Sequence, residues 1–337
     1  MNTRKMRMGL GLIVGAVTGY VAAQQAWALH ALVRINPMRT LTSSPTEPPS
    51  RTRVVDFGEI ETATYVKTHV IEGGIERITY RPRTPVFATP LLFQHGMWHG
   101  AWCWELWQAA FAELGWESHA FSLPGHGRSP ERRPIARCTL DYYLRFLNAE
   151  VERLPVRPII IGHSMGGALI QWYLKYTADN LPAAVLAAPW TAHSLIADGL
   201  GPLITYDPLG IVLMMKTWDA TPLIRGTPNS AARGLIGPEA TIPLETLWDK
   251  LGPESALVLY QHNPPFWAPP LSVHTPLLWV AGEDDPLLRE PAQRRSAEWY
   301  DAEYMIAAGA RHNVMMAHNY ADTAVRIHTW LQRQGIS

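Results

Sequence analysis

Ser164 is the residue whose surroundings point most directly to chemistry. It lies in the stretch Gly162-His163-Ser164-Met165-Gly166, which follows the apolar run Pro158–Ile161 and precedes a helix-like pattern that begins near Gly167. A serine hydroxyl becomes a competent nucleophile when a histidine removes its proton and a carboxylate orients that histidine. The sequence therefore suggests covalent catalysis at Ser164, with a base and an acid supplied from elsewhere in the chain.

The two glycines that flank this position explain why a serine stands there. A strand that leads directly into a helix leaves its turning residue in a strained conformation, which is tolerated when neighbouring residues such as Gly162 and Gly166 carry no colliding side chain. The turn exposes the hydroxyl at the amino end of the helix, where unpaired N–H groups and the helix dipole stabilise a developing oxyanion. The pattern alone is a weak signal, because serine is also a common turn residue, but the predicted strand and helix around it strengthen the hypothesis.

The predicted acid is Asp285. Leu277–Ala281 has the character of a buried strand, and the acidic turn Gly282-Glu-Asp-Asp-Pro286 follows it directly. Acids at the carboxyl end of such a strand lie where ligands bind in open α/β sheets. Asp284, in the same turn, is the alternative acid.

The predicted base is His312. It follows the last predicted strand, Glu303–Ala307, so it can reach back over the same sheet edge. His318, six residues later, is the alternative base. The nucleophile, acid and base then occur in the chain order Ser, Asp, His.

Two backbone amides complete the predicted site. The stretch Gln94-His95-Gly96-Met97-Trp98 leaves a predicted strand through a glycine, so the N–H of Met97 can point into the same pocket as the N–H of Met165. Paired backbone donors at this place would stabilise the oxyanion of a tetrahedral intermediate. Met97 and Met165 are therefore the predicted oxyanion hole.

The elements that must position these residues alternate between strand and helix. Tyr65–Ile71 and Ile75–Tyr80 flank Gly73-Gly74, which predicts a hairpin at the start of the sheet. Beyond it, alternating apolar runs and helical patterns predict a mostly parallel sheet covered on both faces by helices. These segments are Val86–Gln94, Trp104–Leu114, Glu117–Leu123, Pro158–Ile161, Gly167–Tyr176, Ala183–Ala188, Pro276–Ala281, Glu303–Ala307 and Thr323–Gln334.

The alternation is interrupted in the second half of the chain. It stops at Pro189-Trp190 and resumes at Pro276, which predicts an inserted helical lid over residues 190–275. The predicted organisation is an N-terminal membrane anchor or signal segment (1–35), a linker (36–64), the first part of an α/β core (65–189), the lid (190–275) and the second part of the core (276–337).

The N-terminal segment has the composition of an anchor or a signal. Arg4, Lys5 and Arg7 precede Gly9–Val33, which is uncharged and as a helix would span roughly 37 Å, enough for a ~30 Å hydrocarbon core. The preferred interpretation is a single uncleaved membrane anchor. Ala26-Trp27-Ala28 has the form that a signal peptidase accepts, so cleavage and export, or a soluble amphipathic helix, are the alternatives.

Composition excludes other classes of function. Lys plus Arg equals Asp plus Glu at 29 each, so the net charge gives no field to gather nucleic acid. Cys103 and Cys138 show no metal-ligand spacing and are interpreted as buried thiols. His95 and His99 have the i, i+4 spacing of metal ligands, but their glycine-rich surroundings favour structural hydrogen bonding. No metal or organic cofactor is predicted.

Four motifs, around Met97, Ser164, Asp285 and His312 in chain order, together resemble those of the α/β-hydrolase fold family. The resemblance extends over about Thr68 to Leu331. The stretch His95-Gly-Met-Trp-His-Gly-Ala-Trp-Cys-Trp104 is similar to the branch with plant hydroxynitrile lyases, methyl esterases and many uncharacterised bacterial hydrolases. The resemblance implies the α/β-hydrolase fold, oxyanion donors at Met97 and Met165, and the acid at Asp285. Arg311 departs from the family pattern, which usually has glycine before the catalytic histidine.

The expected activity is that of a serine hydrolase, most simply a carboxylic ester hydrolase that acts on a small lipophilic ester. A lyase or a cofactor-free oxidative enzyme that uses the same three residues for proton transfer is the alternative, and a non-enzymatic binding protein on this fold is a third. The lid run Leu209–Met215 either packs on the core or touches substrate. Crowded apolar residues in the lid lead us to expect a preference for medium to long acyl chains; they are Leu203, Ile204, Leu209, Ile211, Val212, Leu213, Met214, Met215 and Trp218.

Overall fold

The computed structural model describes residues 54–336, together with Gly19, Ala22, Ala23, Ala26 and His30. Apart from these five positions, the predicted anchor or signal segment (1–35) lies outside the described residues, as do residues 36–53 of the predicted linker. Within the part of the chain that is described, no helix combines the length and apolar character needed to cross a membrane.

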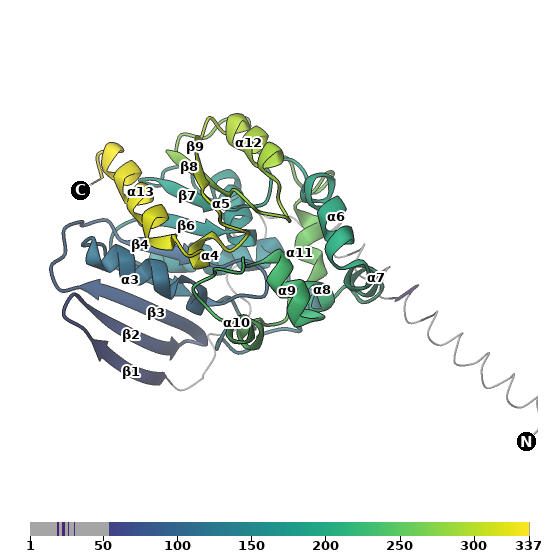
Figure 1. Cartoon of the computed structure of the whole chain (residues 1–337), viewed down its shortest axis with the longest axis horizontal. Helices are drawn as coiled ribbons and strands as arrows, with labels where there is room; N and C mark the ends of the chain where they lie inside the picture. The colour runs from purple at the N-terminus through teal and green to yellow at the C-terminus, as the bar shows by residue number, and fades with distance from the viewer. Residues whose placement is uncertain (1–18, 20–21, 24–25, 27–29, 31–53, 337) are drawn as a thin grey trace, which may run out of the picture.

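Nine strands in the described residues form one sheet, in the order β1-β2-β3-β5-β4-β6-β7-β8-β9 (Figure 1). Neighbouring strands from β5 through to β9 are parallel, whereas β1, β2 and β3 form antiparallel pairs and β3 also pairs antiparallel with β5. The mostly parallel sheet predicted from the sequence is therefore confirmed. The strands are β1 (Val55–Glu61), β2 (Tyr65–Glu72), β3 (Ile75–Pro82), β4 (Leu91–Gln94), β5 (Ser118–Phe121), β6 (Ile159–His163), β7 (Ala184–Ala187), β8 (Leu277–Gly282) and β9 (Glu303–Ala307).

The antiparallel end of the sheet is built around one tight turn. Glu72 pairs with Ile75, and Gly73 and Gly74 between them both have positive φ angles, 58° and 72°. A two-residue hairpin turn of this kind requires left-handed backbone at both positions, which glycine adopts without strain. The turn therefore sets the register of β2 against β3.

Strand β1 corrects one boundary of the sequence analysis. It lies inside the segment predicted as a linker, so that prediction is wrong for Val55–Glu61. All seven residues of β1 are exposed, and the strand pairs with β2 alone at the edge of the sheet. Because β1 buries neither face, its sequence lacks the apolar alternation that reveals a half-buried strand.

Helices cover both faces of the parallel part of the sheet. Helices α3 and α13 pack against each other on the near face in Figure 1, whereas α4 and α5 pack together on the far face. Strands β4 to β8 are buried throughout, as at Ile159, Ile160 and Ile161 of β6. The core helices are α3 (Glu105–Glu113), α4 (Leu140–Arg153), α5 (Met165–Tyr176), α12 (Glu290–Trp299) and α13 (Tyr320–Arg333), with short 3-10 helices at Ala101–Trp104, Ile135–Arg137 and Val314–Met316.

Six helices occupy the chain between β7 and β8, to one side of the sheet in Figure 1. They are α6 (Leu195–Tyr206), α7 (Pro208–Thr217), α8 (Pro222–Arg225), α9 (Pro228–Gly234), α10 (Leu244–Lys250) and α11 (Ala256–Gln261). Asp207 separates α6 from α7: its carboxylate accepts a hydrogen bond from the N–H of Gly210, and Pro208 begins the new helix. We refer to residues 190–275 as the lid.

A buried carboxylate fastens the lid to the core. Glu254 of the lid is fully buried, and its two oxygens lie 3.0 Å from Nε2 of His126 and 3.0 Å from the hydroxyl of Tyr143. The N–H of Ser255 donates to the same carboxylate at 2.7 Å. A buried carboxylate is stable when such donors surround it, so this cluster holds the lid in one position over the sheet edge.

Candidate active site

Ser164 lies at the sharp turn between β6 and α5. It is the residue before the first turn of α5, and its backbone has φ 53° and ψ −115°, a strained conformation for a residue with a side chain. A Cβ atom at Gly162 would come within 2.5 Å of the carbonyl oxygen of Gly166, and one at Gly166 within 2.2 Å of the carbonyl oxygen of Gln94. The flanking glycines therefore permit the close backbone packing that holds Ser164 in this turn.

The structure brings the three predicted side chains into one hydrogen-bonded chain. Nε2 of His312 lies 2.9 Å from Oγ of Ser164, and Nδ1 of the same ring lies 2.8 Å from Oδ2 of Asp285. All three residues are buried. In this geometry the Nδ1–H donates to the carboxylate, which leaves Nε2 free to accept the proton of the serine hydroxyl.

Asp285 rather than Asp284 faces the histidine. The second oxygen of Asp285 accepts hydrogen bonds from the N–H groups of Leu287 and Leu288, at 2.8 and 3.1 Å. Asp284 is exposed, and its backbone N–H donates to the carbonyl of Ala310. The carboxylate that contacts His312 is thus held by the turn that follows β8.

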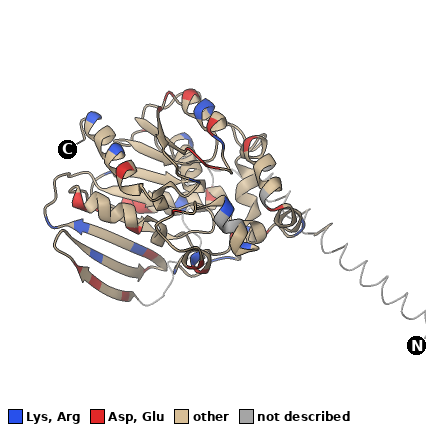
Figure 2. Ribbon diagram, viewed as in Figure 1, with Lys and Arg blue, Asp and Glu red and all other residues tan. Residues whose placement is uncertain are grey.

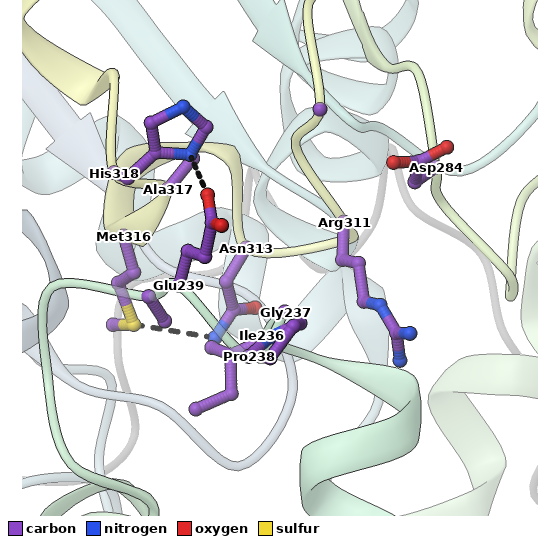
Figure 3. A pocket seen from close by; sticks show the side chains of 12 residues that line it. Ile236, Gly237, Pro238, Glu239, Asp284, Arg311, Asn313, Met316, Ala317 and His318 are labelled. Carbon is purple, nitrogen blue, oxygen red and sulfur yellow. Dashed lines mark hydrogen bonds and ion pairs between the residues drawn. The ribbon is translucent and has the colours of Figure 1, made fainter.

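A separate polar cavity of about 210 Å³ contains the residues that the sequence left as alternatives (Figure 3). His318 faces Glu239 there, with 3.8 Å between Nδ1 and the carboxylate, and it is half exposed. Asp284 and Arg311 also line this cavity, and the guanidinium of Arg311 donates to the carbonyl of Arg233. The arginine therefore points away from Ser164 and leaves the presentation of His312 intact.

The loop after β4 and the start of α5 lie next to Ser164 as predicted. Met97, Ser164 and His312 line one small cavity, and Met165 is the first residue of α5. Among the hydrogen bonds between described residues, neither the N–H of Met97 nor that of Met165 serves as a donor. Neither amide is thus engaged by a backbone acceptor among the described residues, and their role as oxyanion donors stays a prediction.

Trp98 joins this loop to the lid. Its indole N–H donates to the carbonyl of Ala220 at 3.0 Å, and its own carbonyl accepts from the N–H of Gly252 at 2.7 Å. Trp98 has a left-handed backbone, with φ 62°, directly after Met97. The orientation of the Met97 amide therefore depends on how the lid is seated.

Two residues that sequence reasoning passed over also support the site. Nε2 of His163 lies 3.0 Å from the carbonyl oxygen of His312, and the side-chain amide of Asn313 donates to Nε2 of His99 at 3.0 Å. Burial lowers the pKa of His163 well below its ordinary value, so the ring is neutral. Both residues adjoin a predicted site residue in sequence, which is the signal that could have identified them.

His95 and His99 form hydrogen bonds to the backbone, as predicted from the sequence. Nδ1 of His99 donates to the carbonyl of Met97 at 2.6 Å, and Nε2 of His95 accepts from the N–H of Leu123 at 3.0 Å. Burial lowers the pKa of His99 to about 4. Within the described residues no group of three or more histidine, cysteine or acidic side chains is placed to hold a metal ion.

Comparison with known proteins decides the family. The model of the alpha/beta hydrolase family matches residues 91–326, more than two thirds of the chain. The chain belongs to the alpha/beta hydrolase family. The match takes in the Met97 loop, the strand and helix around Ser164, the Asp285 turn and His312.

Individual relatives of this alpha/beta hydrolase are distant and match in part. The chain is 32% identical over 98 residues to "Probable esterase PIR7A" of Oryza sativa subsp. indica, which covers 29% of this chain and 37% of the rice protein. It is 30% identical over 130 residues to the pFDCC methylesterase MES16 of Arabidopsis thaliana, which covers 38% of this chain and 44% of that protein. The chain thus spans less than half the length of these plant relatives.

A solved structure shows the same fold. The crystal structure of Paleococcus ferrophilus monoacylglycerol lipase superimposes with a TM-score of 0.52 at 19% sequence identity, over 77% of this chain and 99% of that one. At this level of identity, the similarity shows that the two proteins share the arrangement of their strands and helices.

Two adjoining cavities lie at Ser164 and within the lid. The cavity at Ser164 has a volume of about 30 Å³, and a second cavity of about 200 Å³ is lined almost entirely by apolar side chains. Leu195, Leu203 and Leu259 line both cavities, so the two lie on either side of these side chains. The larger cavity is completed by Ile196, Ile211, Met214, Met215 and Tyr260.

Both cysteines of this alpha/beta hydrolase are buried and free, as predicted. Burial raises the pKa of Cys138 to about 12 and that of Cys103 well above its ordinary value. A thiol reacts as the thiolate, so neither cysteine competes with Ser164 as a nucleophile at neutral pH.

Proposed function

We propose that this protein is a carboxylic ester hydrolase with Ser164 as nucleophile, His312 as base and Asp285 as orienting acid. The observation that carries the proposal is the hydrogen-bonded chain from Asp285 through His312 to Ser164, at 2.8 and 2.9 Å. The esterase names of the plant relatives are consistent with it.

The proposed reaction has two steps. Oγ of Ser164 attacks the ester carbonyl carbon while Nε2 of His312 takes the hydroxyl proton, and the amides of Met97 and Met165 bind the oxyanion. The C–O bond then breaks, and His312 returns the proton to the departing alcohol. Water, deprotonated by the same ring, then attacks the acyl carbon; the bond to Oγ breaks, His312 returns the proton to Oγ, and the acid leaves. Asp285 stays ionised and holds the Nδ1–H of His312 throughout.

The proposed substrate is an ester with a medium to long apolar acyl chain. A cavity of about 150 Å³ accommodates benzene, with six carbons, so the apolar cavity of about 200 Å³ has room for roughly eight. It adjoins the site through Leu195, Leu203 and Leu259, and its walls offer almost no polar partner to a hydrophilic acyl group. Within Leu209–Met215, Ile211, Met214 and Met215 line the apolar cavity, whereas Leu209, Val212 and Leu213 are exposed. Contact of this run with substrate stays a prediction.

A fluorophosphonate probe and p-nitrophenyl esters test the activity. We expect the purified protein to form a covalent adduct at Ser164 and to turn over aryl esters, with both signals absent in Ser164→Ala. Ester turnover that persists unchanged in Ser164→Ala would overturn the proposed nucleophile. Failure of the probe to label a folded protein that also turns over no ester would favour a binding protein. Labelling without ester turnover would favour a lyase or a cofactor-free oxidative enzyme.

We also propose that residues 1–35 anchor the protein in a membrane. The basic residues before Gly9 and the length of the uncharged segment Gly9–Val33 support this proposal. The full-length protein should then remain with membranes after an alkaline carbonate wash. Recovery of a soluble chain that begins near Leu29 would instead show cleavage and export.

A further inference from the structure

The outer side of the lid concentrates exposed apolar side chains. Five large apolar residues of α6 and α7 are exposed within a stretch of twelve residues, more than in any other stretch of that length among the described residues. Contiguous apolar patches on a protein surface mark contact sites for lipid or for another protein. We call this set the lid face; it consists of Ile204, Leu209, Val212, Leu213 and Met215.

Helix α7 is apolar on its inner and outer sides as far as Met215, and its polar residues Lys216 and Thr217 come at its end. Ile211 and Met214 point inward and line the apolar cavity, whereas Leu209 and Val212 are 68% and 60% exposed on the other side. A helix of this kind is normally buried in a core or in contact with lipid, because a surface helix of a protein in water carries a polar face. The outer side of α7 therefore needs an apolar partner.

Charges are few on this part of the lid, as Figure 2 shows for α6 and α7. Leu195–Thr217 contains two acids and one lysine. Asp207 accepts hydrogen bonds from backbone N–H groups, and Asp198 pairs with Arg295 at 3.1 Å. Lys216 is exposed at the end of α7, where an ammonium group can meet lipid phosphate. The other cluster of exposed apolar residues, at β1, is interspersed with the acids Asp56, Glu59 and Glu61, which suits a solvated edge strand.

The lid face is continuous with the cavity that leads to Ser164. Met215 belongs to both, because it is 55% exposed and also lines the apolar cavity. Leu203, one residue before Ile204 of the lid face, lines both the apolar cavity and the small cavity at Ser164. A partner on the lid face would thus lie beside the apolar cavity.

We propose that the lid face rests on a phospholipid bilayer and takes ester lipids from it into the apolar cavity. The inference rests on the proposed function for the identity of the substrate. The N-terminal sequence supports a bilayer as the occupant: Gly9–Val33 is long enough to span, and the 20 residues from Arg34 to Arg53 reach at most about 70 Å when extended. Such a tether keeps the lid face near the membrane, so a weak affinity of the lid face for lipid is sufficient to hold it on the bilayer.

A fluorescent probe at Leu209 tests the contact directly. The full-length Leu209→Cys protein is labelled with a thiol-reactive bimane and reconstituted into phosphatidylcholine vesicles that carry bromine on their acyl chains. Val325→Cys is the matched control, since Val325 is 47% exposed on α13, at the opposite end of the molecule in Figure 1. Cys103 and Cys138 are buried, so the introduced thiol is the one expected to react.

We expect the bromolipids to quench the Leu209 probe at least twofold more than the Val325 probe. Equal quenching of the two probes, or none, in protein that floats with the vesicles would overturn the proposal. A change in the fluorescence of the Leu209 probe that occurs without vesicles and grows with protein concentration would also overturn the proposal. That result would assign the lid face to contact with a second copy of the chain.

Activity on two substrates separates docking from catalysis. Full-length Val212→Glu should hydrolyse a long-chain ester embedded in phosphatidylcholine vesicles about tenfold more slowly than the wild type, and p-nitrophenyl acetate in water at the same rate. Val325→Glu should change neither rate. If Val212→Glu hydrolyses the embedded ester as fast as the wild type, docking through the lid face is wrong. If the wild type hydrolyses neither ester, the proposed function fails, and the quenching experiment still decides whether the lid face docks.

Discussion

Nε2 of His163 lies 3.0 Å from the carbonyl oxygen of His312, so the residue before the proposed nucleophile donates a hydrogen bond to the main chain of the proposed base. Because burial lowers the pKa of His163, the ring stays neutral and keeps this single donor at neutral pH. His163 touches no substrate and is a positioning residue: it links the turn after β6 to the loop after β9.

His163→Phe removes the donor and keeps a ring of similar size. We expect kcat for a soluble aryl ester to fall roughly tenfold with little change in KM, because a misplaced base affects the chemical step more than binding. His163→Gln restores an N–H donor and should recover much of the loss. Equal activity of the two variants would show that the hydrogen bond to His312 is unimportant.

The nucleophile and the base should behave as one unit. We expect Ser164→Ala and His312→Ala each to lower kcat for an activated ester by roughly 10³ to 10⁶, since either change disables the same proton transfer. Circular dichroism would establish that the variants are folded. A loss below tenfold in either variant would contradict the proposed role.

The two aspartates of the turn after β8 provide a matched pair. Asp285→Asn removes the charge that faces Nδ1 of His312 and should reduce kcat by about 10³ or more, whereas the exposed Asp284→Asn should change it less than about twofold. The measurement is kcat for the same aryl ester. A severe Asp284→Asn phenotype beside a mild Asp285→Asn phenotype would mean that the acid is wrongly assigned.

The dependence of kcat/KM on acyl-chain length should show whether the apolar cavity binds the acyl chain. Each buried methylene contributes about 0.8 kcal/mol, so four further methylenes should raise kcat/KM from p-nitrophenyl acetate to the hexanoate by roughly 10². Ile211→Trp narrows the cavity away from Ser164 and should lower kcat/KM for the octanoate at least about tenfold, with the acetate nearly unchanged. Leu209→Trp, on the outer side of the same helix, is the control. A steady fall in kcat/KM from acetate onward in the wild type would exclude an acyl-chain role for the cavity.

Stability should fall in mild acid, partly through His262. Burial lowers the pKa of His262 from 6.5 to about 3, although the hydrogen bond from Nε2 to the carbonyl of Thr191 acts in the opposite direction. Nδ1 of the same ring accepts from the indole N–H of Trp172. Below its ordinary pKa the unfolded chain binds a proton that the folded chain does not, so this contribution to stability is complete above about pH 6.5 and is lost as the pH falls toward 3. The expected loss is about 1.4 kcal/mol per pH unit for this residue.

Urea unfolding of wild type and His262→Gln at about pH 7.5 and about pH 5.5 measures this contribution. We expect the variant to lose about 1 kcal/mol less than the wild type between these conditions, whatever its stability at the higher pH. His318→Gln, which removes an exposed histidine, serves as the control. An identical pH dependence in wild type and His262→Gln would contradict the assignment.

Several elements that bury an apolar face or end in a sharp turn were predicted from the sequence, but helix α4 was not, although it buries Leu140, Leu144 and Leu147. The buried run of β6, the glycines beside Ser164 and the Gly73-Gly74 turn carry local signals of strand, sharp turn and hairpin. Strand β1 escaped prediction because it buries neither face. Helix α12 escaped because its buried residues are small or polar, namely Ala292, Gln293, Ser296 and Ala297, and give no apolar stripe.

What the sequence by itself determined is the chain order of serine, acid and histidine, at Ser164, the turn with Asp284 and Asp285, and His312. Each of them follows a strand whose carboxyl end faces one edge of a parallel sheet. Tertiary structure alone decided which aspartate faces the histidine, because adjacent residues of a turn point in different directions. It also joined His163 to His312 and formed a cavity from lid residues that are far apart in the chain. Such contacts depend on how separate elements pack, and no local pattern of residue types encodes that packing.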